Sequence, residues 1–248
     1  MVRAIASLAV CVSGAVCGQA TVAWRFEVAS VKPSKADPGS SSGIKTGRGR
    51  LDARNVTLKR CIMGAYGVGP HQIFGGPDWL ESDRFEILAK AEQPIDDDAA
   101  LMAMLQDLLA ERFKLALYRE TRTIRAFVLE VAKNGHKLER AEAGEATTNT
   151  STSNTGVIVD ARKTSMDAFA KILARKIELP VVNHTSLEGG FNVKLQWTPE
   201  GARPGDGVAA EGASIFTAIQ EQLGLRLRLQ KTPVEVVVID HAERPSEN

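Results

Sequence analysis

The chain has 248 residues, enough for one large domain or two small ones, and its 44% hydrophobic and 25% charged residues are ordinary for a globular protein. Its 31 basic and 30 acidic residues leave a net charge of +1. This balance argues against a nucleic-acid partner, because neutralising phosphates requires a basic face or stripe.

The first twenty residues have the pattern of a secretory signal peptide. Arg3 is followed by an apolar stretch from 4 to 17 and by the small-residue ending Gly18-Gln19-Ala20. This layout predicts cleavage after Ala20, a periplasmic or secreted location, and no membrane span after cleavage. Cleavage would leave Cys61 as the remaining cysteine, which we interpret as a small core residue.

Two strand-like segments precede the first predicted helix. "WRFEVASV" is expected to form an N-terminal strand, and residues 50–55 a second one. Between them, Lys45, Arg48 and Arg50 lie in a Gly-rich stretch and are interpreted as part of a solvated loop.

The tripeptide Asp-Ala-Arg occurs at 52–54 and again at 160–162, and it marks a repeated pattern. Each copy precedes a hydroxyl residue, Thr57 or Ser165, that is expected to cap a helix. The apolar residues after each cap recur with the i, i+3, i+4, i+7 spacing of one helix face. Asp52 and Asp160 themselves are interpreted as acceptors for loop N–H groups.

A second pair of helices is predicted after the caps Asp98 and Ser214, the latter helix ending at Gly224. Each helix runs into an alternating strand, and a final strand, 126–132 or 234–240, is expected to pair with it as a hairpin.

The sequence therefore predicts an α+β protein, a tandem duplication of a small β-α-β-β-α-β-β unit with two helices packed on small mixed sheets. The first half is expected over 21–140 and the second over 157–248. Residues 141–156 have no large apolar residue and are predicted to be a flexible linker. The pattern leaves open whether the halves are two separate bodies or share one sheet.

Several segments together resemble the soil-associated family of exported bacterial proteins built on a domain of unknown function. They are "FEVASVKPS", "GGPDWLESDRFEILAKA", "LLAERFKLALYRETRTIRAFVLEVAKNGHKL", "PVVNHTSLEGGFNVKLQWTPE" and "VEVVVIDHAERPSEN". The resemblance implies membership and carries no catalytic residue. Each half also resembles the secretin and TonB-receptor short N-terminal domain, which implies a role in periplasmic protein–protein contact.

The sequence gives no signature of catalysis, cofactor binding or metal binding. The four histidines, His71, His136, His184 and His241, form no H-x-x-x-H pair and have no cysteine beside them. We therefore predict no catalytic, cofactor or metal residue.

The Gly/Pro turn "GGPDWLES" is the strongest candidate for a contact with a partner. Pro77, Asp78 and Trp79 are predicted to form it, because aromatic residues on rigid loops make good anchors. The alternative is that Trp79 caps the hydrophobic core from its loop.

The favoured function is an exported, non-catalytic interaction module of the bacterial envelope, with an envelope protein or another periplasmic component as partner. The oligomeric state is not predicted. The alternative is an exported hydrolase that uses loop residues near His71, Asp78 and His184, and a third hypothesis is a sensor domain acting on a separate membrane protein. An enzyme should have a deep pocket of convergent polar groups with shifted pKa values, whereas an interaction module should have an apolar patch or an open sheet edge.

Overall fold

The computed structural model describes residues 25–37, 39–142, 144–153, 156–198 and 213–246, so the predicted signal peptide lies outside the described residues. The helices are α1 (Leu58–Tyr66), α2 (Asp98–Arg112), α3 (Met166–Ile177) and α4 (Ile215–Leu223), with 3-10 turns η1 (Pro70–Gln72) and η2 (Asp78–Leu80). The strands are β1 (Phe26–Pro33), β2 (Gly43–Gly47), β3 (Arg50–Thr57), β4 (Ile73–Gly75), β5 (Arg84–Ala91), β6 (Ala116–Val131), β7 (Glu139–Arg140), β8 (Thr147–Ser153), β9 (Gly156–Thr164), β10 (Val181–Asn183), β11 (Phe191–Trp197) and β12 (Leu225–His241). The α+β class is confirmed.

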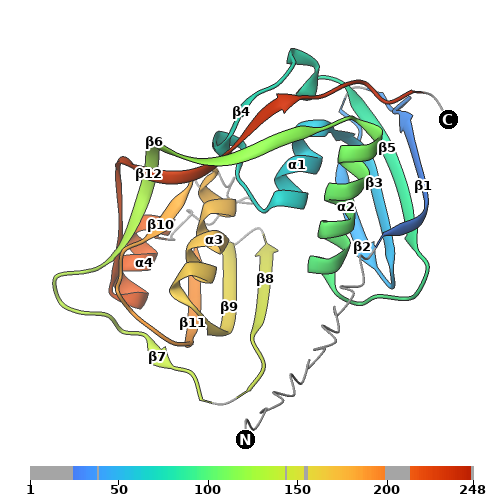
Figure 1. Cartoon of the computed structure of the whole chain (residues 1–248). Coiled ribbons are helices and arrows are strands. Elements are labelled where there is room, and N and C mark those ends of the chain that lie inside the picture. The colour runs from blue at the N-terminus through green and yellow to red at the C-terminus, as the bar shows by residue number, and fades with distance from the viewer. Residues whose placement is uncertain (1–24, 38, 143, 154–155, 199–212, 247–248) are drawn as a thin grey trace, which may run out of the picture.

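The described strands form three sheets, which divide the molecule into two lobes joined by a bridge (Figure 1). The N lobe contains the sheet β1-β5-β3-β2 with α1 and α2, and the C lobe contains the sheet β7-β11-β9-β8 with α3 and α4. The third sheet, β10-β6-β12-β4, runs across both lobes.

The bridge consists mainly of two long strands, β6 and β12, which pair antiparallel from Leu225 with Val131 to His241 with Ala116. The hairpins expected in each half are therefore wrong. Each predicted pair of strands is one continuous strand, and its partner is the long strand of the other half. The reason is local: neither 117–126 nor 229–234 contains the Gly or Asn that a tight hairpin turn requires.

The two halves contain the same elements in the same order: β2-β3-α1-β4-β5-α2-β6 in the first and β8-β9-α3-β10-β11-α4-β12 in the second. Their strand orders also correspond, because β4 pairs parallel with β12 while β10 pairs parallel with β6. The halves thus share one intertwined sheet. That they arose by duplication stays a prediction, as do the domain boundaries given above.

Each lobe has its own hydrophobic core, and each core receives one end of both long strands. Val237 and Ile239 at the end of β12 pack in the N-lobe core with Leu115 and Leu117. In the C-lobe core, the end of β6 and the start of β12 pack together, including Leu129 and Leu225. Neither core is complete without residues from the other half of the chain.

The repeated Asp-Ala-Arg marks a bulge that turns each strand into a helix. The residue after each copy, Asn55 or Lys163, has a positive φ of 51°, and the register of each strand shifts there. A side chain from the neighbouring strand accepts the freed N–H: Glu86 Oε1 from Asn55 (3.0 Å) and Asn192 Oδ1 from Lys163 (3.3 Å).

The helix caps follow the sequence closely. Thr57 and Ser165 accept from the backbone N–H groups of Arg60 and Ala168, both at 3.1 Å, and Ser214 and Gly224 cap α4 as expected. In α2, however, Asp97 rather than Asp98 is the cap, since its carboxylate accepts from Ala99 N at 2.8 Å.

The segment expected as a flexible linker, 141–156, differs from that expectation because it contains β8. This strand pairs with β9 along its whole length, although all seven of its side chains are exposed. Main-chain hydrogen bonds and the β-propensity of Thr therefore order β8 without apolar burial.

Candidate functional site

The turn from Pro77 to Trp79 lies on the N lobe with one side chain anchored in the core. The Trp79 ring stacks on Phe113 at 6.5 Å between centroids and meets Phe85 edge-on at 6.3 Å. The Arg244 guanidinium also lies over the Trp79 ring, 5.2 Å from its centroid. Trp79 is therefore half-buried and caps the N-lobe core, whereas Asp78 is exposed.

An open hollow of about 330 Å³ lies beside this turn, lined by residues that include Lys59, Gly76, Asp78 and Glu81. Two of its charged lining residues form an ion pair with each other, because Lys59 Nζ donates to Glu81 Oε1 at 2.5 Å. Gly76 has a φ of +80°, and a Cβ there would lie 2.3 Å from Leu80 Cδ1, so the turn requires glycine.

The histidines of the hydrolase alternative do not meet. His71 follows Pro70 in η1, where the neighbouring Gln72 donates to Glu235 O, a position in register with Thr121 of β6. His184 N donates to Leu129 O, farther along the same strand. Positions 121 and 129 are about 26 Å apart at a rise of about 3.3 Å per residue. His71 and His184 therefore lie beside distant parts of the bridge, which does not favour a shared site.

Cys61 and Asp52, two other side chains that could be reactive, are buried in the core or held in an ion pair. Burial raises the pKa of the Cys61 thiol to about 12, so the thiolate that nucleophilic chemistry needs is not populated near neutral pH. The hydrogen bond from Arg54 lowers the pKa of Asp52, which is held in an ion pair at 2.8 Å. Among the described residues, no group of three His, Cys, Asp or Glu side chains is placed to hold a metal ion.

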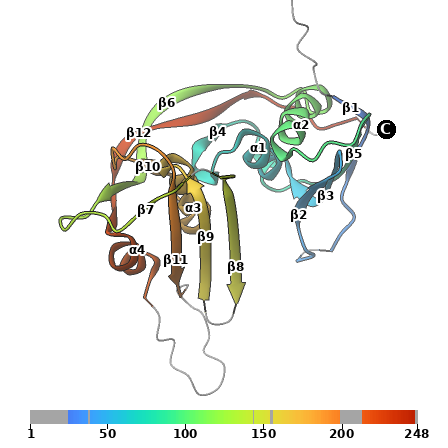
Figure 2. The ribbon, with the colours of Figure 1, turned by 90° about the horizontal axis from the view of Figure 1, so that it is seen from below.

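The clearest open surface is the outer edge of β8. All seven of its residues, Thr147 to Ser153, are exposed, uncharged and free of proline, and the strand has no bulge. Edge strands of this kind can pair with another chain, and proteins normally block them with charges, proline, bulges or a covering element. In Figures 1 and 2, β8 is the edge of the C-lobe sheet that is turned toward the N lobe.

The direction in which the β8 main-chain groups point can be derived from β11, at the opposite edge of the three paired strands β11, β9 and β8. Gln222 bonds both the N–H and the C=O of Gln196, which therefore point away from β9. Because main-chain groups alternate along paired strands, Ile158, opposite Gln196, directs its groups toward Ser151 of β8. The N–H and C=O groups of Thr148, Thr150 and Thr152 then point outward, away from β9.

The other edges of the two lobe sheets are shorter or only partly covered in the described part of the chain. Arg112 Nη2 donates to Ala29 O at 3.2 Å on the edge of β1, which ends at Pro33. On the edge of β11, Gln222 covers Gln196 and β7 covers the first two residues. The strand β2 is only five residues long and has glycine at both ends. Among the described edges of the two lobe sheets, that of β8 is therefore the longest one without a covering group.

Comparison with known families assigns the chain to a family whose function is unknown. The model of the family described as "Protein of unknown function (DUF3738)" matches residues 59–242. The chain belongs to this family. No curated protein and no solved structure matched the chain. The soil association and the likeness to secretin domains gain no support from the family match, which confirms only the domain of unknown function.

Sequence reasoning overlooked β8 because it judged the segment by its lack of apolar residues. The available signal was the Thr-rich run "TTNTSTS", whose β-branched residues favour an extended strand.

In the described residues, no helix is both long enough and apolar enough to cross a bilayer.

Proposed function

We propose that this chain of the DUF3738 family is an exported, non-catalytic interaction module of the bacterial envelope. Its partner is an envelope protein that lays an extended segment along β8 as an additional strand. In this mode of recognition, main-chain hydrogen bonds supply affinity and the side chains of the added strand supply specificity.

The observation that carries the proposal is the unblocked edge of β8. Thr148, Thr150 and Thr152 offer main-chain donors and acceptors in a row, with exposed hydroxyl side chains beside them. The edges of β1 and β11 are partly covered, and this difference supports the edge of β8 as a binding edge. The lack of a deep polar pocket at the predicted loop residues supports a binding role over a hydrolytic one.

The test uses a proline that removes one outward N–H without touching the pairing with β9. Proline is tolerated on edge strands where the N–H faces solvent, so Thr150→Pro is expected to fold. Thr150→Ala is the matched control, because it removes the side chain and keeps the N–H. In crosslinking pull-downs from envelope extract, wild type and Thr150→Ala are expected to recover the same protein, and Thr150→Pro to lose it.

Recovery of the same protein by all three chains would contradict strand addition at β8. Asp78→Ala then tests the turn from Pro77 to Trp79, because Asp78 is exposed whereas Trp79 is anchored between Phe113 and Arg244. Loss of the recovered protein with Asp78→Ala would move the contact to that turn. If no chain recovers a protein above background, the interaction proposal fails.

Export is tested separately by the N-terminus of the protein isolated from the periplasmic fraction. Cleavage after Ala20 predicts that this protein begins at Thr21. A protein confined to the cytoplasm with Met1 intact would contradict the envelope location.

A further inference from the structure

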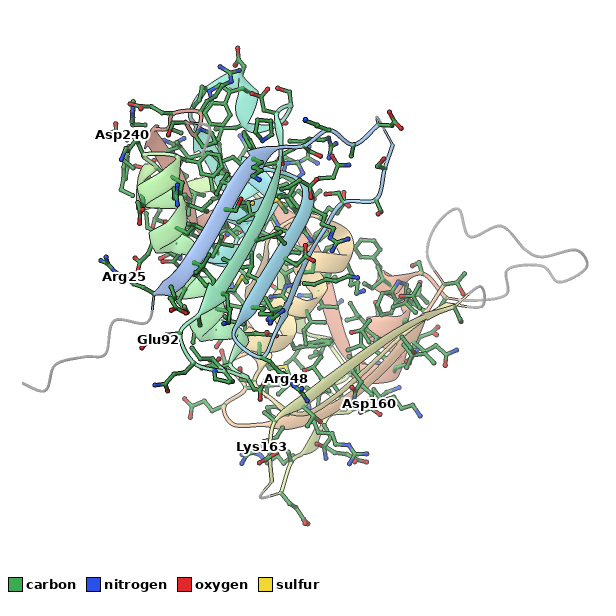
Figure 3. The ribbon with its side chains drawn as sticks, turned by 90° about the vertical axis from the view of Figure 1, so that its right-hand side faces the viewer. Arg25, Arg48, Glu92, Asp160, Lys163 and Asp240 are labelled. Atoms are coloured by element: carbon green, nitrogen blue, oxygen red, sulfur yellow. The ribbon has the colours of Figure 1, made fainter. Side chains whose placement is uncertain are left out.

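The outward face of the N-lobe sheet has an unusual distribution of charge. We call it the basic face (Figure 3). Its side chains form three rows across β1, β5, β3 and β2: Lys32, Glu86 and Arg54; Ser30, Leu88, Asp52 and Lys45; and Val28, Lys90 and Arg50. These rows hold five basic and two acidic residues, and a third acidic residue, Glu27, lies exposed at the β1 bulge beside Val28. The overall net charge of the chain is +1.

The third row concentrates positive charge in a way that does not serve stability. Arg50 and Lys90 are direct cross-strand partners, and like charges in this arrangement are destabilising. No ion pair joins Arg50 or Lys90 to an acidic residue in the described part of the chain. Arg25 and Arg48 lie at the same end of the sheet, together with Glu92 (Figure 3). A local arrangement that costs stability without compensation indicates a role outside folding.

Two large aliphatic side chains lie within this basic surface. Val28 is 61% exposed and Leu88 is 55% exposed, and they neighbour each other diagonally on β1 and β5. The helices α1 and α2 pack on the opposite side of the sheet, and no described element covers this side (Figure 3). The basic face therefore combines exposed apolar groups with a surrounding set of cations, of which Arg54 is paired with Asp52 and the others have no ion pair among the described residues.

We propose that the basic face binds the surface of a bilayer containing anionic phospholipid. Lys and Arg side chains next to such a surface each add about fivefold to affinity, and aliphatic groups gain by entering the headgroup region. This contact is separate from the edge of β8 and does not depend on it. It would hold the N lobe against the membrane and leave the C lobe to bind a partner.

Other occupants fit the basic face less well. Protein interfaces rely on Trp and Tyr anchors and are depleted in Lys, whereas this face has three lysines and no aromatic residue. A second copy stacked face to face would place five cations against five. The hollows near Asp78 and near Arg162 are lined by other residues than those of this face.

The test compares vesicles of phosphatidylcholine with and without phosphatidylglycerol in a flotation assay. All variants share the same N-terminus, so any binding by the first twenty residues is common to them. Wild type is expected to prefer the anionic vesicles and to lose this preference in high salt. Arg50→Gln with Lys90→Gln is expected to weaken binding by roughly 25-fold, at about fivefold per cation.

The matched control removes two cations from the equivalent face of the C lobe, through Arg162→Gln and Lys194→Gln, and is expected to bind like wild type. Lys90→Glu is a further variant that replaces the repulsion with Arg50 by an attractive pair. It is expected to weaken vesicle binding while the melting temperature stays equal or rises, which separates lost binding from lost folding.

Three results would overturn the proposal. They are equal binding of wild type to both vesicle types, equal losses in the control and in the Arg50 and Lys90 variants, and tighter binding to duplex DNA than to anionic vesicles at the same salt. The last would assign the basic face to a nucleic acid. The pull-down with Thr150→Pro is unaffected by any of these outcomes.

Discussion

The N and C lobes share an order of elements but differ in the surfaces that they expose. In the N lobe, β1 covers the whole of β5 and the outward sheet face is basic. In the C lobe, β7 covers only two residues of β11, Gln222 closes part of the remaining edge, and the Thr-rich β8 is open. The shared features are the buried ones, namely the bulge, the capped helices and the alternating strands. The exposed features differ, which is expected when two similar scaffolds bind different partners.

The largest expected effect tests whether the lobes are energetically separate. Phe85 and Phe191 hold corresponding positions in β5 and β11, and both are buried. Phe85→Ala or Phe191→Ala is expected to cost about 3–5 kcal/mol of unfolding free energy. Each core contains ends of both β6 and β12. Urea unfolding monitored by circular dichroism should therefore show a single transition for either variant. Two transitions, with only the mutated lobe shifted, would show that the lobes are independent.

A smaller effect is expected at the two bulges, where the residues differ although the backbone does not. Lys163 pays the cost of a left-handed conformation, so Lys163→Gly is expected to stabilise the chain by up to about 1 kcal/mol. Asn tolerates this conformation, and Asn55 Nδ2 donates to Ser40 O at 3.0 Å, so Asn55→Gly should bring no gain. Equal gains at both bulges in thermal unfolding would contradict this difference.

The smallest effect concerns Asp52 and its pairing with Arg54. The pKa of Asp52 is lowered in the folded chain, so its contribution to stability is present above the ordinary carboxyl pKa and is lost as pH falls below about 4. The difference in melting temperature between wild type and Asp52→Asn should therefore shrink from pH 7 to pH 3. The effect is small because the pair is solvent-exposed.

Asp160→Asn serves as the matched control, since Asp160 has no ion pair in the described part of the chain. A difference for Asp52→Asn that stays constant across this pH range would argue against the pairing with Arg54 as its source.

Much of the fold could be predicted because its signals are local. The caps at Thr57 and Ser165, the helix faces that follow them and the alternating β5 and β11 all depend on residues within a few positions of each other. The continuity of β6 and β12 could not be predicted so easily, since it depends on which distant strand is the partner. The lack of Gly or Asn in 117–126 and 229–234 is a local signal against tight hairpins, but no local signal identifies the long strand of the other half as the partner.

The candidate surfaces were harder to predict than the fold. The Gly-rich stretch around Lys45, Arg48 and Arg50 predicts a solvated loop, whereas Lys45 and Arg50 lie on paired strands. Arg50, Asp52 and Arg54 alternate along β3 and share one face of the sheet, and Lys90 joins them only through the sheet order. Likewise, the openness of β8 depends on what lies beside it, which no short stretch of sequence states.

The crossed strands of the bridge have a consequence for a chain that is cut. A protease that cleaves between β7 and β8 would separate the halves covalently, yet β6 would still lie against β12, β4 against β12 and β10 against β6. Each fragment alone lacks strand ends that complete its own core, so neither should fold by itself. Mixed together, the two fragments should reassemble, and the family's scaffold could therefore serve as a split protein whose refolding reports that two tethered molecules have met.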